Sequence, residues 1–334
     1  MPFLRERSGA KGSPYRWSPE KIAALLFVLL PFALLAARIL RGDLAATDPL
    51  GLGAPGLGGP GLNAGLGPGA AGGLGGGAAG GLGGGPALGA RPLVETLRFL
   101  GDWAVRLLLI TLAVTPARRL FNWPKLLNAR RTLGLGAAAL VAVHFGLYCI
   151  DMGSFSVVVR EIVLRIYLTI GFVALLGLLA LSSTSWDGAV ARLGAERWRR
   201  LHLLAYPITA LAILHFFMQQ KLDVTEPTLM AGFFLWLMGW RVLQRYGHGT
   251  GLLALVLLAV SAGLATALLE AGWYLAATGI DPKRVLAANL AFSYSIRPAW
   301  WVAGLGIAVA LASEAALRIR PLPARRARAS SAVT

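Results

Sequence analysis

The feature that most constrains this chain is a series of apolar runs, each about as long as a bilayer is thick. A membrane-spanning helix needs about 20 predominantly apolar residues. Soluble chains carry about 25% charged residues, whereas this chain has 14%, with 56% hydrophobic residues. The sequence therefore predicts an all-α, polytopic membrane helix bundle of about eight spans. The expected spans are 22–40, 97–115, 133–150, 162–181, the middle of 197–221, 229–243, 252–274 and 299–317.

The basic residues indicate how these spans are oriented. A net charge of +17 can signal nucleic-acid binding, but here the lysines and arginines gather at the termini and at the ends of the apolar runs. Cytoplasmic loops of membrane proteins carry an excess of such residues. Eight spans place both termini and every strongly basic connection on the cytoplasmic side. We expect the first run to be a retained span rather than a signal peptide, because arginines close it and no clear cleavage site follows.

Two features exclude other classes of site. Residues 49–92 consist almost entirely of Gly, Leu, Ala and Pro, a composition typical of flexible coil, and we expect a disordered periplasmic loop. This segment is not a phosphate-binding loop, because such loops follow a strand and open a helix. The single cysteine, Cys149, excludes an intrachain disulfide and cysteine-based metal centres.

Histidines inside the apolar runs are the candidate functional residues. An ionisable residue within the membrane is costly and marks a functional site by default. His144 and His215 lie on spans predicted to run in the same direction, at similar depth in the outer half of the bilayer. Two facing imidazoles can ligate the iron of a b-type heme. A membrane histidine that only packs or hydrogen-bonds within the bundle is the alternative, and His248, in a polar turn, is predicted to be solvated.

A second candidate site lies near the cytoplasmic face. His202 is predicted there, with Arg130 and Arg131 on the same side. No second histidine is available at that depth, so an inner heme would have one histidine ligand or a different partner. Arginines could equally bind a flavin phosphate or a heme propionate. On one ideal helix His202 and His215 would point about 140° apart, although Pro207 between them could redirect the helix.

Four segments together resemble a known family, the ferric-reductase-like transmembrane domains. Within it they are most similar to the heme-binding membrane subunits of periplasmic methionine-sulfoxide reductase systems. The resemblance covers about residues 93–245 and includes the positions of His144, His202 and His215. The segments are GDWAVRLLLITLAVTPARRL (101–120), ARRTLGLGAAALVAVHFGLY (129–148), RIYLTIGFVALLGLLALSSTSW (165–186) and RLGAERWRRLHLLAYPITALAILHFF (192–217).

The resemblance implies a function in electron transfer. It implies heme b and FMN as cofactors and a location in the bacterial inner membrane. Electrons would pass from the quinone pool or a cytoplasmic flavin reductase to a periplasmic molybdopterin-containing methionine-sulfoxide reductase subunit (MsrP). We expect His144 and His215 to ligate the outer heme, and His202, with Arg130 or Arg131, to mark the inner cofactor site. No catalytic residue is expected, because the chain would be the electron-transfer subunit rather than the catalytic one.

The chain also departs from this family. Its glycine-rich loop is longer, and residues 246–334 add two spans with no counterpart in short family members. Ile166 stands where the family usually has proline. Arg130 lies fourteen residues before His144, where related oxidases carry a second histidine. We therefore divide the chain into a basic N-terminus with the first span (1–48), the glycine-rich loop (49–92), the heme-binding core (93–245) and a C-terminal two-span extension with a basic tail (246–334).

Two competing functions are compatible with the sequence. A ferric or quinone reductase of the same fold would share the heme but not the partner. A transporter without heme would need discontinuous helices or intramembrane acidic residues. Glu270 is the only plausible carboxylate within the later spans.

Overall fold

The computed structural model describes residues 18–41, 92–220, 223–249, 251–292 and 295–319. The predictions for the N-terminal basic segment, for the glycine-rich loop up to residue 91, for residue 221 at the end of the fifth predicted span and for the basic tail lie outside these residues. The described residues form helices and contain no strand. The helices are α1 (Pro19–Arg41), α2 (Pro92–Leu120), the 3-10 helix η1 (Pro124–Leu126), α3 (Leu127–Met152), α4 (Phe155–Leu164), α5 (Ile166–Ser183), α6 (Asp187–Leu193), α7 (Ala195–His202), α8 (Ala205–Gln219), α9 (Thr225–Arg245), α10 (Leu252–Thr278), α11 (Pro282–Ala288) and α12 (Pro298–Ile319).

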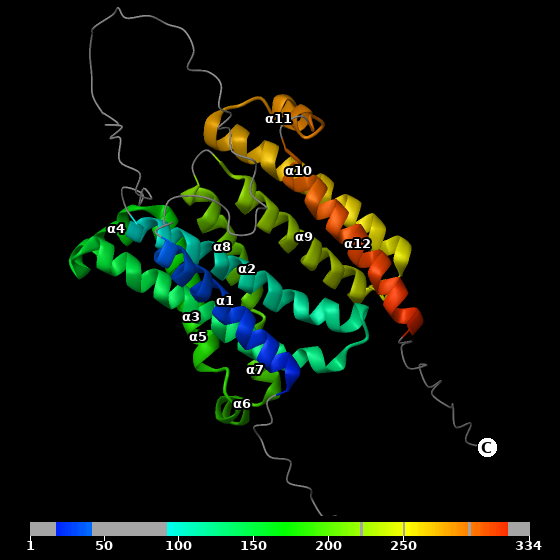
Figure 1. Ribbon diagram of the computed structural model, residues 1–334, viewed down its shortest axis with the longest axis horizontal. Helices are drawn as coiled ribbons and strands as arrows, with labels where there is room; N and C mark the ends of the chain where they lie inside the picture. Colours follow the sequence, from blue (N-terminus) through cyan, green and yellow to red (C-terminus); the bar gives the residue numbers. More distant parts are fainter. Residues whose placement is uncertain (1–17, 42–91, 221–222, 250, 293–294, 320–334) are drawn as a thin grey trace, which may run out of the picture.

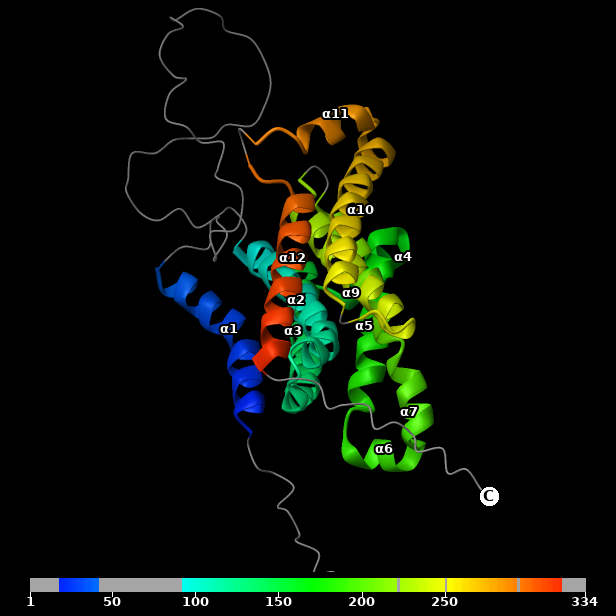
Figure 2. The same cartoon turned by 90° about the vertical axis from the view of Figure 1, so that its right-hand side faces the viewer.

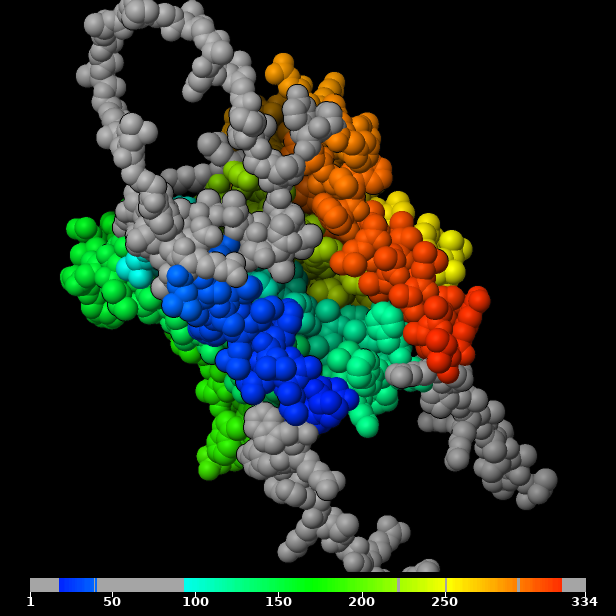
Figure 3. All heavy atoms as spheres, in the orientation of Figure 1, coloured from blue at the N-terminus to red at the C-terminus, as the bar shows by residue number. Residues whose placement is uncertain are grey.

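The long helices form one bundle in which α2 lies near the centre (Figure 1). It packs against α1, α3, α8, α9 and α12. The short helices α6 and α7 lie at one end of the bundle and α11 at the opposite end (Figure 2). In the space-filling view, α1 and α12 lie on opposite sides of one face, with residues of α2 and α3 between them (Figure 3). We call the α6–α7 end the inner end and the α11 end the outer end.

The prediction of an all-α membrane bundle is confirmed. In the described part of the chain, six helical segments are long and apolar enough to cross a membrane: 19–38, 124–152, 166–183, 195–219, 252–278 and 298–319. The other two predicted spans form α2 and α9, which are 29 and 21 residues long but more polar. Their charges meet inside the bundle, where Arg106 of α2 donates to a carboxylate oxygen of Glu226 of α9 at 2.8 Å.

Small residues let the helices of the core approach closely. Gly136 of α3 faces α1, and a Cβ atom added there would lie only 2.3 Å from Cγ2 of Val28. Leu107 of α2 and Leu140 of α3 are fully buried beside this contact layer. Between helices in a membrane, such close packing replaces the hydrophobic effect as the stabilising force.

The predicted fifth span is not one helix. α7 ends at His202, and α8 begins at Ala205. Pro207 has no N–H group and cannot continue the helical hydrogen bonding. The Tyr206 N–H instead bonds the carbonyl of Leu203 at 3.1 Å, which closes a tighter turn. The expectation of a continuous helix was therefore wrong, and the break lies just before Pro207, the residue that the sequence offered as a possible point of redirection.

The predicted fourth span is also divided. Its helix was expected to begin near residue 162, but α4 ends at Leu164 and α5 begins at Ile166. Arg165 between them is extended, with φ −115° and ψ 106°. A residue that precedes proline usually takes this conformation, and Arg165 takes it although Ile166 follows. The break places the start of α5 at the outer end of the bundle.

The C-terminal extension packs on α9 through α10 and α12. These two helices approach through glycines. A Cβ atom at Gly263 of α10 would lie 2.9 Å from the carbonyl oxygen of Ala299 in α12, and one at Gly306 of α12 would lie 2.7 Å from Cβ of Ala259 in α10. The extension is therefore a close-packed helix pair added to the side of the core.

Candidate functional site

His144 of α3 is held against α2 by one hydrogen bond and one glycine. Its Nδ1 lies 2.7 Å from the carbonyl oxygen of Leu97. Because a carbonyl only accepts hydrogen bonds, Nδ1 carries the proton and donates it. The ring lies directly on Gly101, where an added Cβ atom would be 3.0 Å from Cε1 and 3.1 Å from Nδ1. The unprotonated Nε2 then has a free lone pair, as a metal ligand requires.

His215 of α8 repeats this arrangement on α5. Its Nδ1 lies 2.7 Å from the carbonyl oxygen of Tyr167. The ring lies on Gly171, where an added Cβ atom would be 2.7 Å from Nδ1 and 2.8 Å from Cε1. In both cases the glycine follows the accepting carbonyl by four residues. The two histidines therefore have the same tautomer, and Nε2 is the free nitrogen of both.

The two arrangements lie side by side. α3 packs against α5, and Phe145 and Phe172, which follow His144 and Gly171 in sequence, have ring centroids 5.9 Å apart. The imidazoles of His144 and His215 are close enough to interact electrostatically. Sequence reasoning expected these two histidines at one depth on neighbouring spans, and the structure brings them together.

This pair suits a metal held by a macrocycle. A heme supplies four nitrogens of its own, so two histidine ligands complete its iron coordination. In the described part of the chain, no group of three or more His, Cys, Asp or Glu side chains could hold a metal ion. Neither Nε2 has a hydrogen-bond partner among the described residues, whereas each Nδ1 is fixed by a backbone carbonyl, the usual support of a ligating histidine. The residues present therefore fit a bis-histidine heme.

His202 at the inner end is in a different state. Its Nδ1 lies 3.1 Å from the carbonyl oxygen of Trp198, and its Nε2 lies 3.3 Å from Oγ of Ser185. Its ring stacks on Trp198 with centroids 3.9 Å apart. Both nitrogens are therefore engaged, and metal ligation by His202 requires the contact with Ser185 to be given up.

A basic cluster lies beside His202. Arg130 is close enough to interact electrostatically with His202, Tyr206 and Arg241. Arg241 donates from Nε to the Tyr206 hydroxyl at 3.2 Å and from Nη2 to the carbonyl oxygen of Leu112 at 2.8 Å. Sequence reasoning missed Tyr206 and Arg241. The signal that could have found Arg241 is its position one helical turn inside the end of an apolar span.

The two arginines expected beside His202 have different surroundings. Arg130 belongs to the basic cluster. Arg131 instead pairs with Asp187 of α6 at 2.8 Å, and these side chains are 49% and 88% exposed. The structure therefore groups Arg130 with His202 and places Arg131 in a surface contact. His248 is exposed in the turn after α9, as predicted.

Glu270 of α10 has a partner on each carboxylate oxygen. It is 1% exposed, and it accepts from Nδ2 of Asn289 and from Nη1 of Arg297, both at 3.2 Å. Asn289 follows α11 and Arg297 precedes α12, so the carboxylate joins three parts of the extension at its outer end. This connection gives a structural role to the carboxylate of the later spans that a transporter hypothesis would use.

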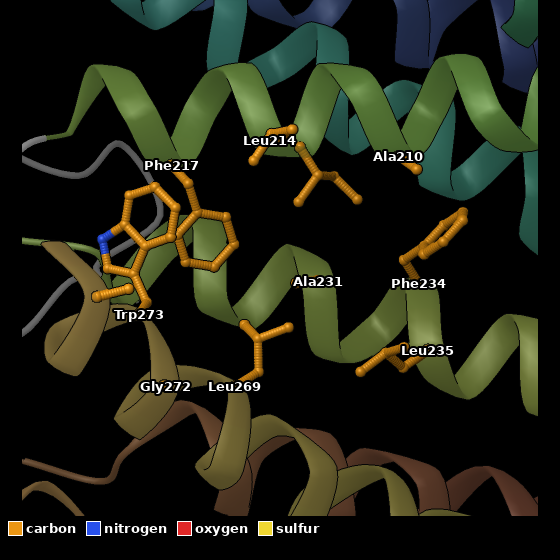
Figure 4. Close-up of a pocket in the computed structure, with 11 residues that line it drawn as sticks. Ala210, Leu214, Phe217, Ala231, Phe234, Leu235, Leu269, Gly272 and Trp273 are labelled. Atoms are coloured by element: carbon orange, nitrogen blue, oxygen red, sulfur yellow. The ribbon is translucent and has the colours of Figure 1, made fainter. Parts of the chain in front are cut away.

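A groove of about 400 Å³ lies between α8, α9 and α10 (Figure 4). Its lining is apolar and includes Leu214 and Phe217 of α8, Phe234 of α9 and Trp273 of α10. At about 100° per residue, Phe217 points to the opposite side of α8 from His215. The groove is therefore separated from the histidine pair by the thickness of α8 and is not part of that site.

Comparison with known proteins matches a family to a region that includes His144 and His202 and ends shortly before His215. The family described as "Ferric reductase like transmembrane component" matches residues 100–213. The chain is 47% identical over 161 residues to the protein-methionine-sulfoxide reductase heme-binding subunit MsrQ of Xanthomonas campestris pv. campestris (strain 8004), a match that covers 48% of this chain and 73% of the relative. It is 40% identical over 157 residues to the MsrQ subunit of Caulobacter vibrioides, covering 46% of this chain and 75% of the relative. No solved structure matches the chain.

Proposed function

The chain belongs to the MsrQ family of heme-binding subunits of protein-methionine-sulfoxide reductases, and from this premise we propose that it carries a b-type heme between His144 and His215. The chain is a multi-pass membrane protein with a role in membrane electron transfer. In the proposed function it passes electrons across the bacterial inner membrane to a periplasmic molybdopterin-containing methionine-sulfoxide reductase subunit (MsrP). The donor is the quinone pool or a cytoplasmic flavin reductase.

The observation that carries this proposal is the matched pair of imidazoles. Each Nδ1–H group donates to a backbone carbonyl 2.7 Å away, which fixes the tautomer and raises the basicity of Nε2. A heme held by the two Nε2 atoms supplies a one-electron carrier within the membrane. His144 and His215 would hold such a group through their Nε2 atoms, and the apolar side chains of the core helices would keep water from it. No residue of this chain is proposed to act on methionine sulfoxide.

We propose that the inner cluster binds the anionic part of a second cofactor, either the phosphate of FMN or a propionate of a second heme. Arg130, Arg241 and the Tyr206 hydroxyl offer the donors that such a group needs. His202 marks the site, and it can serve as a ligand of an inner heme only if Ser185 releases Nε2. In this proposal Arg131 is not a ligand, because Asp187 already pairs with it.

The proposed electron acceptor can be tested by mixing the reduced protein with MsrP and its substrate. We expect the chemically reduced protein to be reoxidised when MsrP and methionine sulfoxide are added together, and to stay reduced when either is omitted. A His248→Ala variant should be reoxidised in the same way as the wild type. His248 is exposed, in the turn after α9, and does not belong to the pair formed by His144 and His215. Reoxidation by a ferric chelate but not by MsrP with its substrate would instead favour a ferric reductase of the same fold.

The second cofactor has its own test. Flavin released by acid from the purified protein should be FMN, and Arg241→Leu should lower its content while the heme absorbance of the outer site stays unchanged. An inner heme predicts instead that two hemes are present per chain and that His202→Ala removes one of them. A protein with neither flavin nor a second heme would contradict the proposed inner site.

A further inference from the structure

We propose that Gly101 and Gly171 are positioning residues that set the orientation, and thereby the ligand strength, of His144 and His215. The inference rests on the proposed heme site, but it concerns two residues that have no side chain with which to ligate iron. Each glycine lies under one imidazole and four residues after the carbonyl to which that imidazole donates. The spacing is the same on two different helices, α2 and α5.

Helix geometry explains why the spacing is four. In an α-helix each Cα–Cβ bond tilts toward the N-terminus, so the side chain at i+4 covers the backbone one turn earlier. The carbonyl of residue i already accepts the helical hydrogen bond from residue i+4, and only its second lone pair can accept from another helix. A side chain at i+4 stands in the way of that approach. Glycine at 101 and 171 leaves the carbonyls of Leu97 and Tyr167 open.

The distances show how little room there is. A Cβ atom at Gly171 would lie 2.7, 2.8 and 3.1 Å from Nδ1, Cε1 and Cγ of His215. One at Gly101 would lie 3.0 and 3.1 Å from Cε1 and Nδ1 of His144, with Nε2 at 4.0 Å. A methyl group at either position must move the imidazole away from the carbonyl. The imidazole must move farther for a substitution at Gly171 than for one at Gly101. We therefore expect the substitution at Gly171 to have the larger effect.

The consequence is electronic as well as geometric. Donation from Nδ1–H to a carbonyl makes Nε2 a stronger donor to a metal, which favours the ferric over the ferrous state. A longer hydrogen bond from Nδ1–H to the carbonyl weakens the preference for the ferric state. Substitution at either glycine is therefore expected to raise the midpoint potential of the heme and to alter the relative orientation of the two imidazole planes.

The test compares three alanine variants of the full-length protein by potentiometric titration and by electron paramagnetic resonance of the oxidised state. Second-shell partners of metal ligands typically change metal affinity about 10–100-fold. A tenfold change in the ferric-to-ferrous preference corresponds to about 59 mV for one electron. We expect Gly171→Ala to raise the midpoint potential by at least this amount or to lose the heme, and Gly101→Ala to raise it by less.

Gly146→Ala is the matched control. Gly146 lies on α3 two residues after His144, and an added Cβ atom there meets nothing within 4 Å. The Gly146→Ala substitution gives the same gain in helix propensity as the two test substitutions, but its methyl group contacts no imidazole. Loss of heme from Gly101→Ala or Gly171→Ala supports the inference when the apoprotein of that variant unfolds at the same temperature as the Gly146→Ala apoprotein. Potentials and resonance spectra of both test variants that match the control would overturn the inference, while a wild-type protein without heme would overturn the proposed function itself.

Discussion

The ion pair between Glu270 and Arg297 offers a quantitative test of how the extension is held together. Glu270 is 1% exposed and the Arg297 side chain is 31% exposed, with 3.2 Å between the paired atoms. Removal of one partner from a buried ion pair costs about 3–5 kcal/mol, because the remaining charge is left without compensation. Since Arg297 is partly exposed, we expect Arg297→Met to lie near the lower end of this range, at about 3 kcal/mol.

The double substitution separates the pair from its parts. Replacement of both partners of a buried ion pair by apolar residues is often neutral or stabilising. We therefore expect Glu270→Leu combined with Arg297→Met to be more stable than Arg297→Met alone, although Asn289 then loses an acceptor. The assay is thermal unfolding of the detergent-solubilised protein, in which about 3 kcal/mol lowers Tm by roughly 6–12 °C for large domains.

Two results would refute this reasoning. The first is an Arg297→Met variant that unfolds at the wild-type temperature, because a buried Glu270 carboxylate without its partner must lower the stability. The second is a double variant that is less stable than each single variant, which would mean that the two side chains stabilise the protein independently. The heme absorbance should be unchanged in all three variants, since the pair lies in the extension and not beside His144 or His215.

Three further predictions concern packing and charge. Gly263→Leu should lower Tm strongly without changing the heme spectrum, because its side chain would meet a backbone carbonyl of α12 that cannot move aside. Arg106→Leu should destabilise the protein by less than the roughly 3–5 kcal/mol of a fully buried pair, measured by the same unfolding assay, because it leaves Glu226 unpaired between α2 and α9 while the two side chains are 20% and 30% exposed. Arg131→Ala should change stability by no more than about 0.5 kcal/mol, as is usual for surface substitutions, because its pair with Asp187 is exposed; a larger loss of Tm would contradict this.

Much of the fold could be predicted because apolar run length and basic residues are direct consequences of the bilayer. The pairing of His144 with His215 also followed from sequence, since equal depth on spans of the same direction needs only helix rise and topology. The break after His202 was foreseeable in part, because Pro207 removes one donor. The break at Arg165 was not, because no proline or glycine follows it.

The supports of the histidines could not be predicted. Which carbonyl faces His144 depends on the packing of α2 against α3, and glycines 101 and 171 look like any other glycine in an apolar helix. The separation of Arg130 from Arg131 likewise depends on the rotation of α3, which directs one arginine toward the basic cluster and the next toward α6. Neighbouring residues on a helix point about 100° apart, so adjacent arginines need not share a site.

The central claim is that His144 and His215 together hold a b-type heme, and a reduced-minus-oxidised visible spectrum tests it most directly. The purified wild-type protein, produced with ample heme, should show a low-spin b-type spectrum. That spectrum should be lost in both His144→Ala and His215→Ala and retained in His248→Ala. A wild-type protein without heme absorbance, or a spectrum that survives both substitutions unchanged, would contradict the account.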